Sequence, residues 1–341
     1  MAPYTSSELA ERIEQLPRFP LAHLPTPIEN LGNLTRLVGG PRILVKRDDL
    51  TGLAFGGNKT RQLEFILGDA LAQGADVLVM GAGSQSNFCR QATAAACKAG
   101  LDIQLILQHG VKGPERQGNL LLDELMGADI TIVDVDSMHQ LRPLFRERAD
   151  ELRALGRRPY IVDPLVDSAP LASVGFVNAV LELKSQLEAM GTDIDAILVA
   201  AANMTQAGIL LGVKALGLPW RVIGMAPILF EEDRAVDIAR ITVQTAQVLG
   251  LKITFEPWEV INDPSFIGPG YGLVDDAARS AFRLLARTEG LFLDPVYTSK
   301  AMAGLLAWAK DGRLQKDERV LFWHTGGTPA IFSYSQELMG P

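Results

Sequence analysis

Short runs of β-branched and apolar residues alternate with longer stretches of helical periodicity along most of the chain. Because the short runs are apolar throughout and glycine marks many junctions, this alternation predicts an α/β fold with parallel sheets covered by helices on both faces. The expected strands are Arg42–Lys46, Val77–Met80, Ile103–Leu107, Ile130–Val133, Tyr160–Val162, Ala196–Ala200, Arg221–Ala226 and Val320–His324. The expected helices are Asn58–Ala72, Asn87–Ala99, Gly118–Met126, Leu141–Leu155, Ala172–Met190, Thr205–Ala215, Arg234–Leu249, Asp275–Glu289 and Thr298–Lys310.

Length and composition limit the number of domains and the kinds of partner that this protein can have. A chain of 341 residues allows about two domains, and two α/β sheets match that length. Its 48% of hydrophobic residues exclude a mainly disordered protein. The net charge of −8, from 32 Lys+Arg against 40 Asp+Glu, argues against a nucleic acid as the main partner.

Signals for targeting, membranes or metals are not found in the sequence. The start lacks the basic residues and apolar run of a secretory signal, and no run reaches the roughly 18 apolar residues of a transmembrane helix. Two cysteines, Cys89 and Cys97, are too few for a disulfide framework, and the 4 histidines show no metal-ligand spacing. We therefore expect a cytoplasmic protein with reduced thiols, without a membrane partner or a metal.

A lysine follows the first of two polar turns. The strand that ends at Lys46 runs into charged residues, and a Gly-Gly turn then opens a helix at Asn58. Asn is a good N-cap, and Gly57 allows a close approach of the backbone. Lys59 then lies in the first helical turn, where the helix dipole favours loss of its proton and makes it a nucleophile. The alternative is a solvated lysine on a surface helix.

The second turn follows the strand Val77–Met80 and leads into the helix that begins at Asn87. It contains Ser84, Gln85 and Ser86. Small hydroxyl and amide groups with free backbone N–H groups form an anion site suited to a carboxylate or a phosphate. The alternative is an ordinary capped helix.

These turns and three later motifs resemble the fold-type-II pyridoxal-phosphate enzymes (tryptophan synthase β-like). More narrowly, they resemble the family of D-cysteine desulfhydrase and 1-aminocyclopropane-1-carboxylate (ACC) deaminase, from Pro25 over nearly the whole chain. The motifs are Gly56-Gly57-Asn58-Lys59-Thr60-Arg61, Gln85-Ser86-Asn87, Pro269-Gly270-Tyr271-Gly272, Leu293-Asp294-Pro295-Val296-Tyr297-Thr298-Ser299-Lys300 and His324-Thr325-Gly326-Gly327-Thr328-Pro329. The resemblance implies two interleaved three-layer αβα domains with mainly parallel sheets. The large cofactor-binding domain would comprise residues 1–52 plus 164–341, and the small domain residues 53–163.

The resemblance also implies the cofactor and the residues around it. Lys59 would hold pyridoxal 5'-phosphate as a Schiff base, and Asn87 would contact its phenolic oxygen. Lys59, Ser86, Tyr271 and Tyr297 are the expected catalytic residues, since a phenol near the reacting atoms can pass protons. The residues expected to contact the cofactor are Lys59, Asn87, Ala201, Ala202, Asn203, Met204, Thr205 and Thr298. Those expected to bind a small amino-acid substrate are Ser84, Gln85, Ser86, Asn87, His324 and Thr325, although His324 also fits a hydrogen-bonded turn residue.

Thr298 separates the two reactions of the resembled family. The deaminase has a glutamate at this place, facing the pyridine nitrogen, and the desulfhydrase type has a threonine. A carboxylate keeps the pyridinium protonated, whereas a hydroxyl gives a neutral hydrogen bond that suffices for expelling a good β leaving group. Thr298 therefore favours β-elimination over opening of a cyclopropane ring.

Two loops depart from the family pattern. The phosphate-binding turn reads Ala200 to Gly208, with Ala201 and Met204 where the family has glycine, so positive φ is hindered and Met204 is expected to crowd the approach. The turn after the fifth strand reads Val166-Asp167-Ser168-Ala169 instead of Gly-Gly-Ser-Asn. A different substrate or reaction, weaker cofactor binding, or loss of activity would each explain these changes.

Together these observations predict a pyridoxal-phosphate lyase or deaminase that releases ammonia and a 2-keto acid from a small amino acid. D-cysteine desulfhydrase-like β-elimination is the first hypothesis. ACC deaminase or a lyase for another amino acid is the second, and a catalytically inactive relative that binds the cofactor is the third. The resemblance also implies a homodimer with the cofactor in the cleft between the domains.

Overall fold

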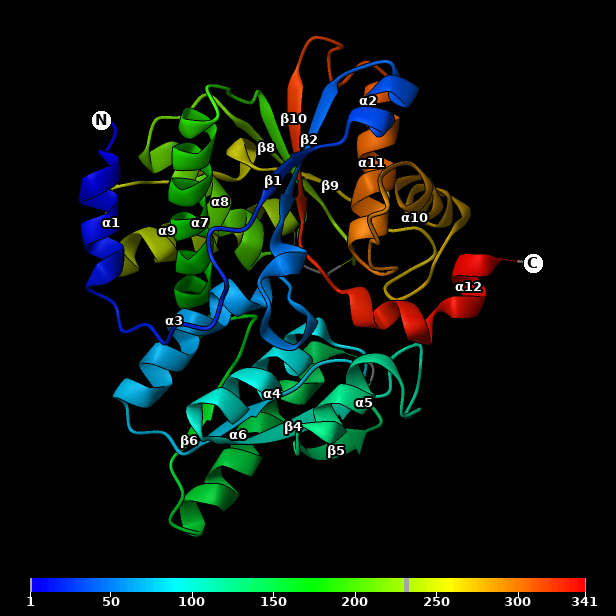
Figure 1. The fold of residues 1–341 in the computed structure, drawn as a ribbon. Coiled ribbons are helices and arrows are strands. Elements are labelled where there is room, and N and C mark those ends of the chain that lie inside the picture. Colours follow the sequence, from blue (N-terminus) through cyan, green and yellow to red (C-terminus); the bar gives the residue numbers. More distant parts are fainter. Residues whose placement is uncertain (1, 136, 230–232, 341) are drawn as a thin grey trace.

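The computed structural model describes residues 2–135, 137–229 and 233–340, and these form two sheets, one above the other in Figure 1. Every pair of neighbouring strands is parallel except β1 and β2. The large sheet has the order β1 (Ile28–Asn30), β2 (Arg42–Arg47), β10 (Arg319–His324), β7 (Ala196–Ala200), β8 (Arg221–Met225) and β9 (Ile261–Asp263). The small sheet has the order β5 (Asp129–Val133), β4 (Asp102–Gln108), β3 (Val77–Met80) and β6 (Pro159–Ile161).

Helices cover both faces of each sheet. On the large sheet, α3, α7, α8 and α9 lie on one side and α2, α10 and α11 on the other (Figure 1). On the small sheet, Leu78 and Met80 of β3 pack toward α4, whereas Val77 and Val79 pack toward α6. The helices are α1 (Ser6–Glu14), α2 (Gly32–Val38), α3 (Lys59–Ala72), α4 (Asn87–Ala99), α5 (Gly118–Leu125), α6 (Met138–Ala154), α7 (Ala169–Ala189), α8 (Met204–Ala215), α9 (Arg234–Val248), α10 (Asp276–Glu289), α11 (Thr298–Lys310) and α12 (Ser335–Met339).

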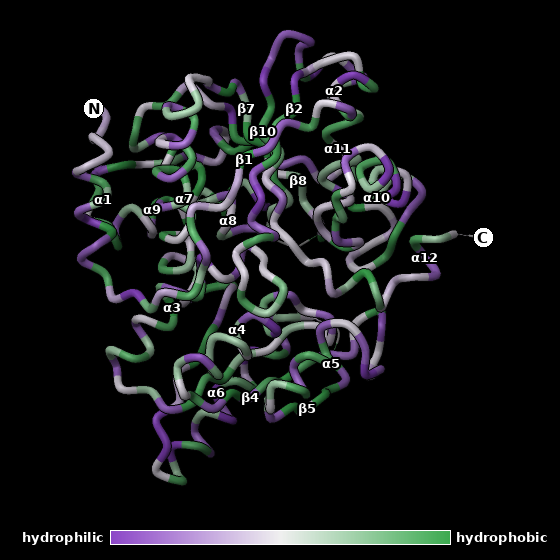
Figure 2. Tube along the Cα trace, in the orientation of Figure 1, coloured by the Kyte–Doolittle hydropathy of each residue, from purple (hydrophilic) through white to green (hydrophobic). Residues whose placement is uncertain are grey.

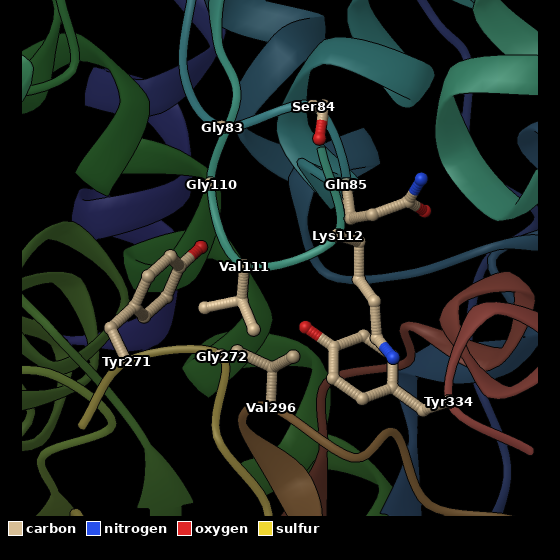
Figure 3. Close-up of a pocket in the computed structure, with 10 residues that line it drawn as sticks. All are labelled: Gly83, Ser84, Gln85, Gly110, Val111, Lys112, Tyr271, Gly272, Val296 and Tyr334. Carbon is tan, nitrogen blue, oxygen red and sulfur yellow. The ribbon is translucent and has the colours of Figure 1, made fainter. Parts of the chain in front are cut away.

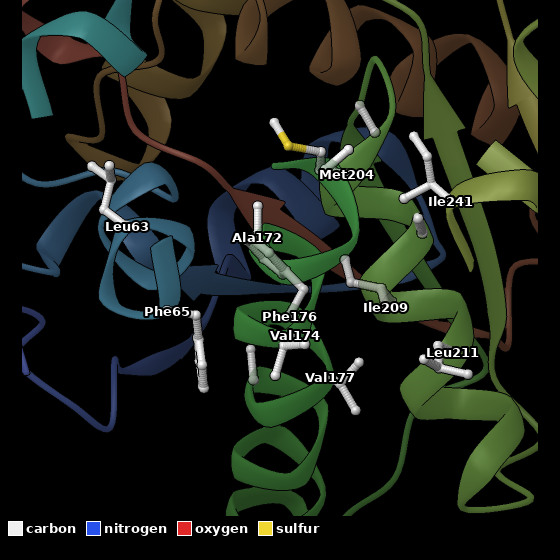
Figure 4. Packing of buried hydrophobic residues seen from close by; sticks show 14 of the residues in the cluster. Leu63, Phe65, Ala172, Val174, Phe176, Val177, Met204, Ile209, Leu211 and Ile241 are labelled. Atoms are coloured by element: carbon white, nitrogen blue, oxygen red, sulfur yellow. The ribbon is translucent and has the colours of Figure 1, made fainter. Parts of the chain in front are cut away.

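The main hydrophobic core lies between the large sheet and helices α3, α7, α8 and α9. The inner strand β7 is hydrophobic along its length, and so is β10 between its terminal Arg319 and His324 (Figure 2), as expected for strands buried on both faces. Helices α7 and α8 pack side by side, with Phe176 and Ile209 between them (Figure 4). Their close approach requires Gly208, because a Cβ there would lie 2.2 Å from the carbonyl oxygen of Ser173.

The predicted fold class is confirmed as two interleaved three-layer αβα units with mainly parallel sheets. The chain forms β1 and β2 of the large sheet, then the small sheet, and then returns to the large sheet. All eight expected strands and nine expected helices are present with shifts of at most three residues at their ends. The strands Ile28–Asn30 and Ile261–Asp263 were not expected, because each has a single isoleucine followed by two polar residues and so forms no apolar run. Helices α1, α2 and α12 were not expected either. The domain bounds at residues 53 and 163 stay a prediction.

Within the described ranges, the structure contains no helix that is long and apolar enough to cross a membrane.

Candidate active site

The predicted site segments follow strands of both sheets at their carboxyl ends, which is where parallel sheets place their ligand sites. Two contacts show that these segments meet. The backbone N–H of Asn58 donates to the carbonyl oxygen of Thr325 at 2.9 Å, so the turn after β2 lies against the turn after β10. A Cβ on Gly327 would lie 2.8 Å from the side-chain nitrogen of Asn87, so the turn after β3 reaches the same place.

Lys59 is the first residue of α3, and its side chain is partly buried. Among the described residues, none forms a hydrogen bond or an ion pair with its amine. The amine lies over the ring of Phe88, 5.4 Å from its centroid. Burial lowers the pKa of Lys59 to about 8, since no carboxylate offsets the loss of solvent. Roughly a fifth of this amine is therefore neutral at about pH 7.4, far more than for a solvated lysine, and this fraction is available as a nucleophile.

The turn before Lys59 is held by helix α4. Ala54 and Phe55 have positive φ angles of 43° and 69°, which L-residues rarely adopt. Arg90 is fully buried on α4 and donates to the carbonyl oxygens of Ala54 at 2.9 Å and Gly56 at 3.0 Å. Arg90 thus stabilises the strained backbone that leads to the lysine.

A buried ion network fixes the start of α3 two residues after the lysine. The guanidinium of Arg61 donates two hydrogen bonds to Asp48 and two to Glu182, all at 2.9 Å. Lys46 also donates to Glu182, at 2.6 Å, and Trp323 donates to Asp48 at 2.8 Å. The Arg61 guanidinium holds the pKa of Glu182 at about 2 against the effect of its burial. All these charges are paired.

Ser86 and Asn87 form the beginning of α4. The Ser86 hydroxyl accepts from the N–H groups of Phe88 and Cys89, both at 3.2 Å, and so caps the helix. The side-chain oxygen of Asn87 accepts from the amide of Asn119 at 2.9 Å. This contact fixes the Asn87 side chain with its nitrogen close to the turn after β10.

Two of the predicted substrate residues have side chains that are already bonded within the protein. The Ser84 hydroxyl donates to the carbonyl oxygen of His109 at 2.7 Å. Gln85 accepts from the N–H of Asn119 at 2.9 Å and donates to the carbonyl oxygen of Gln117 at 2.9 Å. Both residues line a small cavity that Tyr271 lines from another side (Figure 3).

Tyr271 and Tyr297 are brought together from distant parts of the chain. Their hydroxyl oxygens lie 2.6 Å apart, and their rings meet edge to face at 5.9 Å between centroids. Tyr297 precedes α11 as its N-cap, whereas Tyr271 belongs to the loop between β9 and α10. Burial raises the pKa of both phenols, so the pair is neutral and holds two exchangeable protons near neutral pH.

Thr298 is fully buried and pairs with an acid that the sequence analysis did not assign. Its hydroxyl donates to the carboxylate of Asp294 at 2.8 Å and accepts from the Asp294 N–H at 2.6 Å. The same carboxylate accepts from the N–H groups of Val296, Tyr297 and Thr298 at the start of α11. Asp294 therefore fixes the orientation of the Thr298 hydroxyl.

The predicted phosphate turn lies beside the lysine turn. The Thr205 hydroxyl accepts from the side-chain amides of Asn58 at 3.0 Å and Gln62 at 3.2 Å. The N–H of Ala201 donates to the carbonyl oxygen of Met225, and the N–H of Met204 donates to the side chain of Asn203. These two N–H groups are consequently engaged, whereas the N–H groups of Thr205 and of the following residue lack helical partners.

Met204 does not have a positive φ, and its side chain is buried in the main hydrophobic cluster at the start of α8 (Figure 4). That it crowds the approach of a phosphate stays a prediction. The turn at residues 164–168 lies next to the phosphate turn, since the Asn203 amide donates to the carbonyl oxygen of Pro164 at 3.3 Å. Asp167 in that turn is exposed.

His324 is placed as a hydrogen-bonded turn residue. Its Nδ1 accepts from the N–H of Gly326 at 3.2 Å, so its Nε2 carries the proton and donates to the carbonyl oxygen of Phe292 at 3.0 Å. The side chain is fully buried, and no free ring nitrogen remains for a substrate. Thr325 contributes its carbonyl oxygen to the lysine turn, as described above.

The architecture and this site define a class of protein. Residues 20–326 match the family model described as pyridoxal-phosphate dependent enzyme, and the chain belongs to that family. It is 38% identical to a 1-aminocyclopropane-1-carboxylate deaminase of Burkholderia ambifaria over 95% of this chain and 98% of the relative. The corresponding enzyme of Burkholderia vietnamiensis is 37% identical, with the same coverage.

Solved structures agree with these relatives. The chain superposes with a TM-score of 0.89 on a crystal structure described as an ACC deaminase homologue, with 36% identity and 99% coverage of both chains. Escherichia coli diaminopropionate ammonia lyase has a TM-score of 0.68 at 17% identity, covering 98% of this chain and 91% of the lyase, which shows the shared fold alone. The family and its relatives depend on pyridoxal phosphate.

The residues present fit this cofactor. Lys59 offers an unpaired amine of lowered pKa, which is the group that condenses with an aldehyde. The first turn of α8 offers unpartnered N–H groups and the positive end of a helix dipole, which suit a phosphate. The hydrogen bond from Asn58 to Thr205 joins the two places. Within the described ranges, no group of three metal-ligating side chains is placed to hold a metal.

Proposed function

We propose that this enzyme is a lyase or deaminase that releases ammonia and a 2-keto acid from a small amino acid. Its simplest reaction is β-elimination from a D-cysteine-like substrate to give pyruvate. The observation that supports this proposal is the Lys59 amine, unpaired and with a pKa of about 8, at the start of a helix that the buried Arg61 network holds in place. Such an amine can take a proton from the substrate Cα and return it.

The other site residues would bind the reactants and move protons. Thr205 and the N–H groups at the start of α8 would bind the phosphate of the cofactor, and the Ser86 turn would bind the substrate carboxylate. When bound, pyridoxal phosphate supplies an electron sink for the negative charge that develops at Cα. The pair of Tyr271 and Tyr297 holds exchangeable protons and would deliver one to the leaving group.

Thr298 supports β-elimination as the first choice. Its hydroxyl donates to Asp294, so the oxygen presents a lone pair and no charge of its own toward other neighbours. A neutral hydrogen bond is enough when the leaving group is good, as a thiolate is. The carboxylate of Asp294 accepts four hydrogen bonds, one of them from Thr298.

A second candidate is deamination of the cyclopropane amino acid itself. The supporting observation is the identity of 38% over 95% of the chain with a protein named for that activity. A third candidate, an inactive relative that binds the cofactor, is supported by the two engaged N–H groups of the phosphate turn. The three candidates differ in their products, so one assay separates them.

The experiment measures keto-acid release from D-cysteine, β-chloro-D-alanine and the cyclopropane acid, with pyridoxal phosphate present. Pyruvate from the first two supports β-elimination, and 2-oxobutyrate from the third alone supports the deaminase. Lys59→Ala is expected to lower turnover about a thousandfold and to abolish the visible absorption band of lysine-linked cofactor. Lys98→Ala, an exposed lysine on α4, is the matched control and should change neither readout. A band without any keto acid would favour the inactive relative.

Assembly and domain division belong to the same proposal. The homodimer implied by the resemblance is tested by sedimentation of the purified protein at micromolar concentration. Limited proteolysis tests the independence of the small domain. Cuts near residues 53 and 163 that leave the segment between them intact would support it. Neither result affects the reaction proposed above.

A further inference from the structure

Lys300 is a buried cation that the site described above does not use. It lies in the first turn of α11, three residues after Tyr297, and is 1% exposed. Its amine donates to the carbonyl oxygen of Ile267 at 2.6 Å and to that of Gly270 at 2.8 Å. In the described part of the chain, no carboxylate lies within ion-pair distance of it.

This position is unfavourable for a cation. Burial lowers the pKa of Lys300, and the positive end of the α11 dipole opposes its charge as well. An apolar side chain of similar volume would fill the same space without these costs. The reason for a lysine therefore lies in the two carbonyl groups that it binds.

Those carbonyls belong to the loop that carries Tyr271. The loop between β9 and α10 has no regular secondary structure, and Gly268 and Gly270 in it have positive φ angles of 68° and 159°. Few backbone hydrogen bonds stabilise it internally, namely Ile267 to Pro264 and Leu273 to Gly270. Gly270 directly precedes Tyr271, so a contact to its carbonyl fixes the peptide from which the tyrosine starts.

We propose that Lys300 is a positioning residue for the tyrosine pair. It binds the Tyr271 loop to the helix that begins beside Tyr297 and so keeps the two hydroxyl oxygens 2.6 Å apart. The inference rests on the proposed function in one respect, which is the role of this tyrosine pair in proton transfer. A hydrogen bond of that length is lost when one partner moves by less than an ångström.

The test observes the pair directly, in the full-length protein labelled with meta-fluorotyrosine. The chain has 5 tyrosines, so fluorine NMR gives few signals, and Tyr271→Phe and Tyr297→Phe assign the two of interest. In Lys300→Met, both signals are expected to shift while those of Tyr4 and Tyr160 stay in place. Lys310→Met, at the exposed end of the same helix, is the matched control and should shift none of them.

Turnover gives a second readout. Keto-acid release by Lys300→Met is expected to fall about ten- to a hundredfold in kcat, with KM little changed, because reacting groups are displaced rather than removed. If the unsubstituted protein releases no keto acid, the proposed function fails, and the fluorine spectra still decide the role of Lys300.

Several outcomes would overturn the inference. One is a folded Lys300→Met variant in which the Tyr271 and Tyr297 signals are unchanged. Another is a shift of all tyrosine signals together, which indicates a general structural role. If Lys300→Met does not fold, Lys300→Gln gives the decision, because its amide can donate to one carbonyl at a time and the same two signals must shift.

Discussion

Lys59 and Arg61 lie two residues apart in the first turn of α3, but within the described residues only Arg61 is paired with carboxylates. Arg61 is 1% exposed and makes hydrogen bonds to two carboxylates, those of Asp48 and Glu182. Lys59 is more exposed and has no carboxylate partner among the described residues, so burial alone lowers its pKa to about 8. Arg61 is paired and holds the helix in place, whereas Lys59 is unpaired and has a lowered pKa.

One helical turn thus combines a fixed attachment to the sheet with an unpaired amine. A reactive amine must avoid ion pairs, because a carboxylate neighbour would raise its pKa and keep it protonated. A helix that carries such an amine still needs fixed attachment to the sheet. Here the attachment is provided two residues further on, where the side chain of Arg61 binds Asp48 and Glu182.

Removing the paired cation, Arg61, should cause the largest change in the free energy of unfolding. Arg61→Met leaves Asp48 and Glu182 buried with fewer partners, and we expect a loss of about 3–5 kcal/mol in the free energy of unfolding. Urea denaturation at pH 7 measures this loss. Arg153→Met on α6, whose ion pair with Asp150 is exposed, is the control and should cost less than about 1 kcal/mol. Equal losses in the two variants would show that the buried network stabilises the fold no more than an exposed ion pair does.

Removing the unpaired cation, Lys59, should instead raise the free energy of unfolding. The pKa of Lys59 falls from 10.5 to about 8 on folding, which corresponds to a penalty of about 3 kcal/mol at neutral pH. Without bound cofactor, Lys59→Met should therefore be more stable than the natural protein by about that amount at pH 7.

The pH dependence of this gain follows from proton uptake. Between the folded value near 8 and the unfolded value of 10.5, the unfolded state binds the extra proton, so the natural protein gains stability as pH rises. The advantage of Lys59→Met is thus complete below pH 8 and disappears as pH rises through 10.5. Lys46→Met, which removes a partner of Glu182, is the control and should destabilise the protein. Parallel destabilisation of both variants would refute the assignment.

The sequence singles out Lys59 but not the ion network beside it, and the reason is physical. Lys59 follows a Gly-Gly turn at a helix start, which is a local pattern that a single sequence displays. Glu182 lies 121 positions from Arg61, and nothing local to either residue indicates their contact. The same holds for Lys300 and the loop it binds, since the motif shows a lysine without showing the carbonyl groups it meets.

Strands were predicted well because their apolar runs are also local, and β3 and β7 begin and end where expected. The polar turn after β3 was harder to interpret. Ser84 and Gln85 look like ligand-binding groups in the sequence, but their side chains bond to His109, Gln117 and neighbouring backbone. Whether a polar side chain faces a ligand or the protein depends on tertiary contacts, which the pattern of residue types does not contain.

The smallest change in stability is expected when the hydrogen bonds between the lysine turn and the phosphate turn are removed. Thr205→Val keeps the shape of the side chain but removes the acceptor of two amides, those of Asn58 and Gln62. We expect a loss of about 1–2 kcal/mol in stability, from amide donors left unsatisfied, and about tenfold weaker binding of pyridoxal phosphate. Thr242→Val on α9 is the control, because its buried hydroxyl bonds chiefly to the carbonyl oxygen of Ile238 in its own helix. Cofactor titration by absorbance separates the two variants. If Thr205→Val binds the cofactor as tightly as Thr242→Val, the Thr205 hydroxyl contributes to folding alone and the phosphate would be held by backbone N–H groups without it.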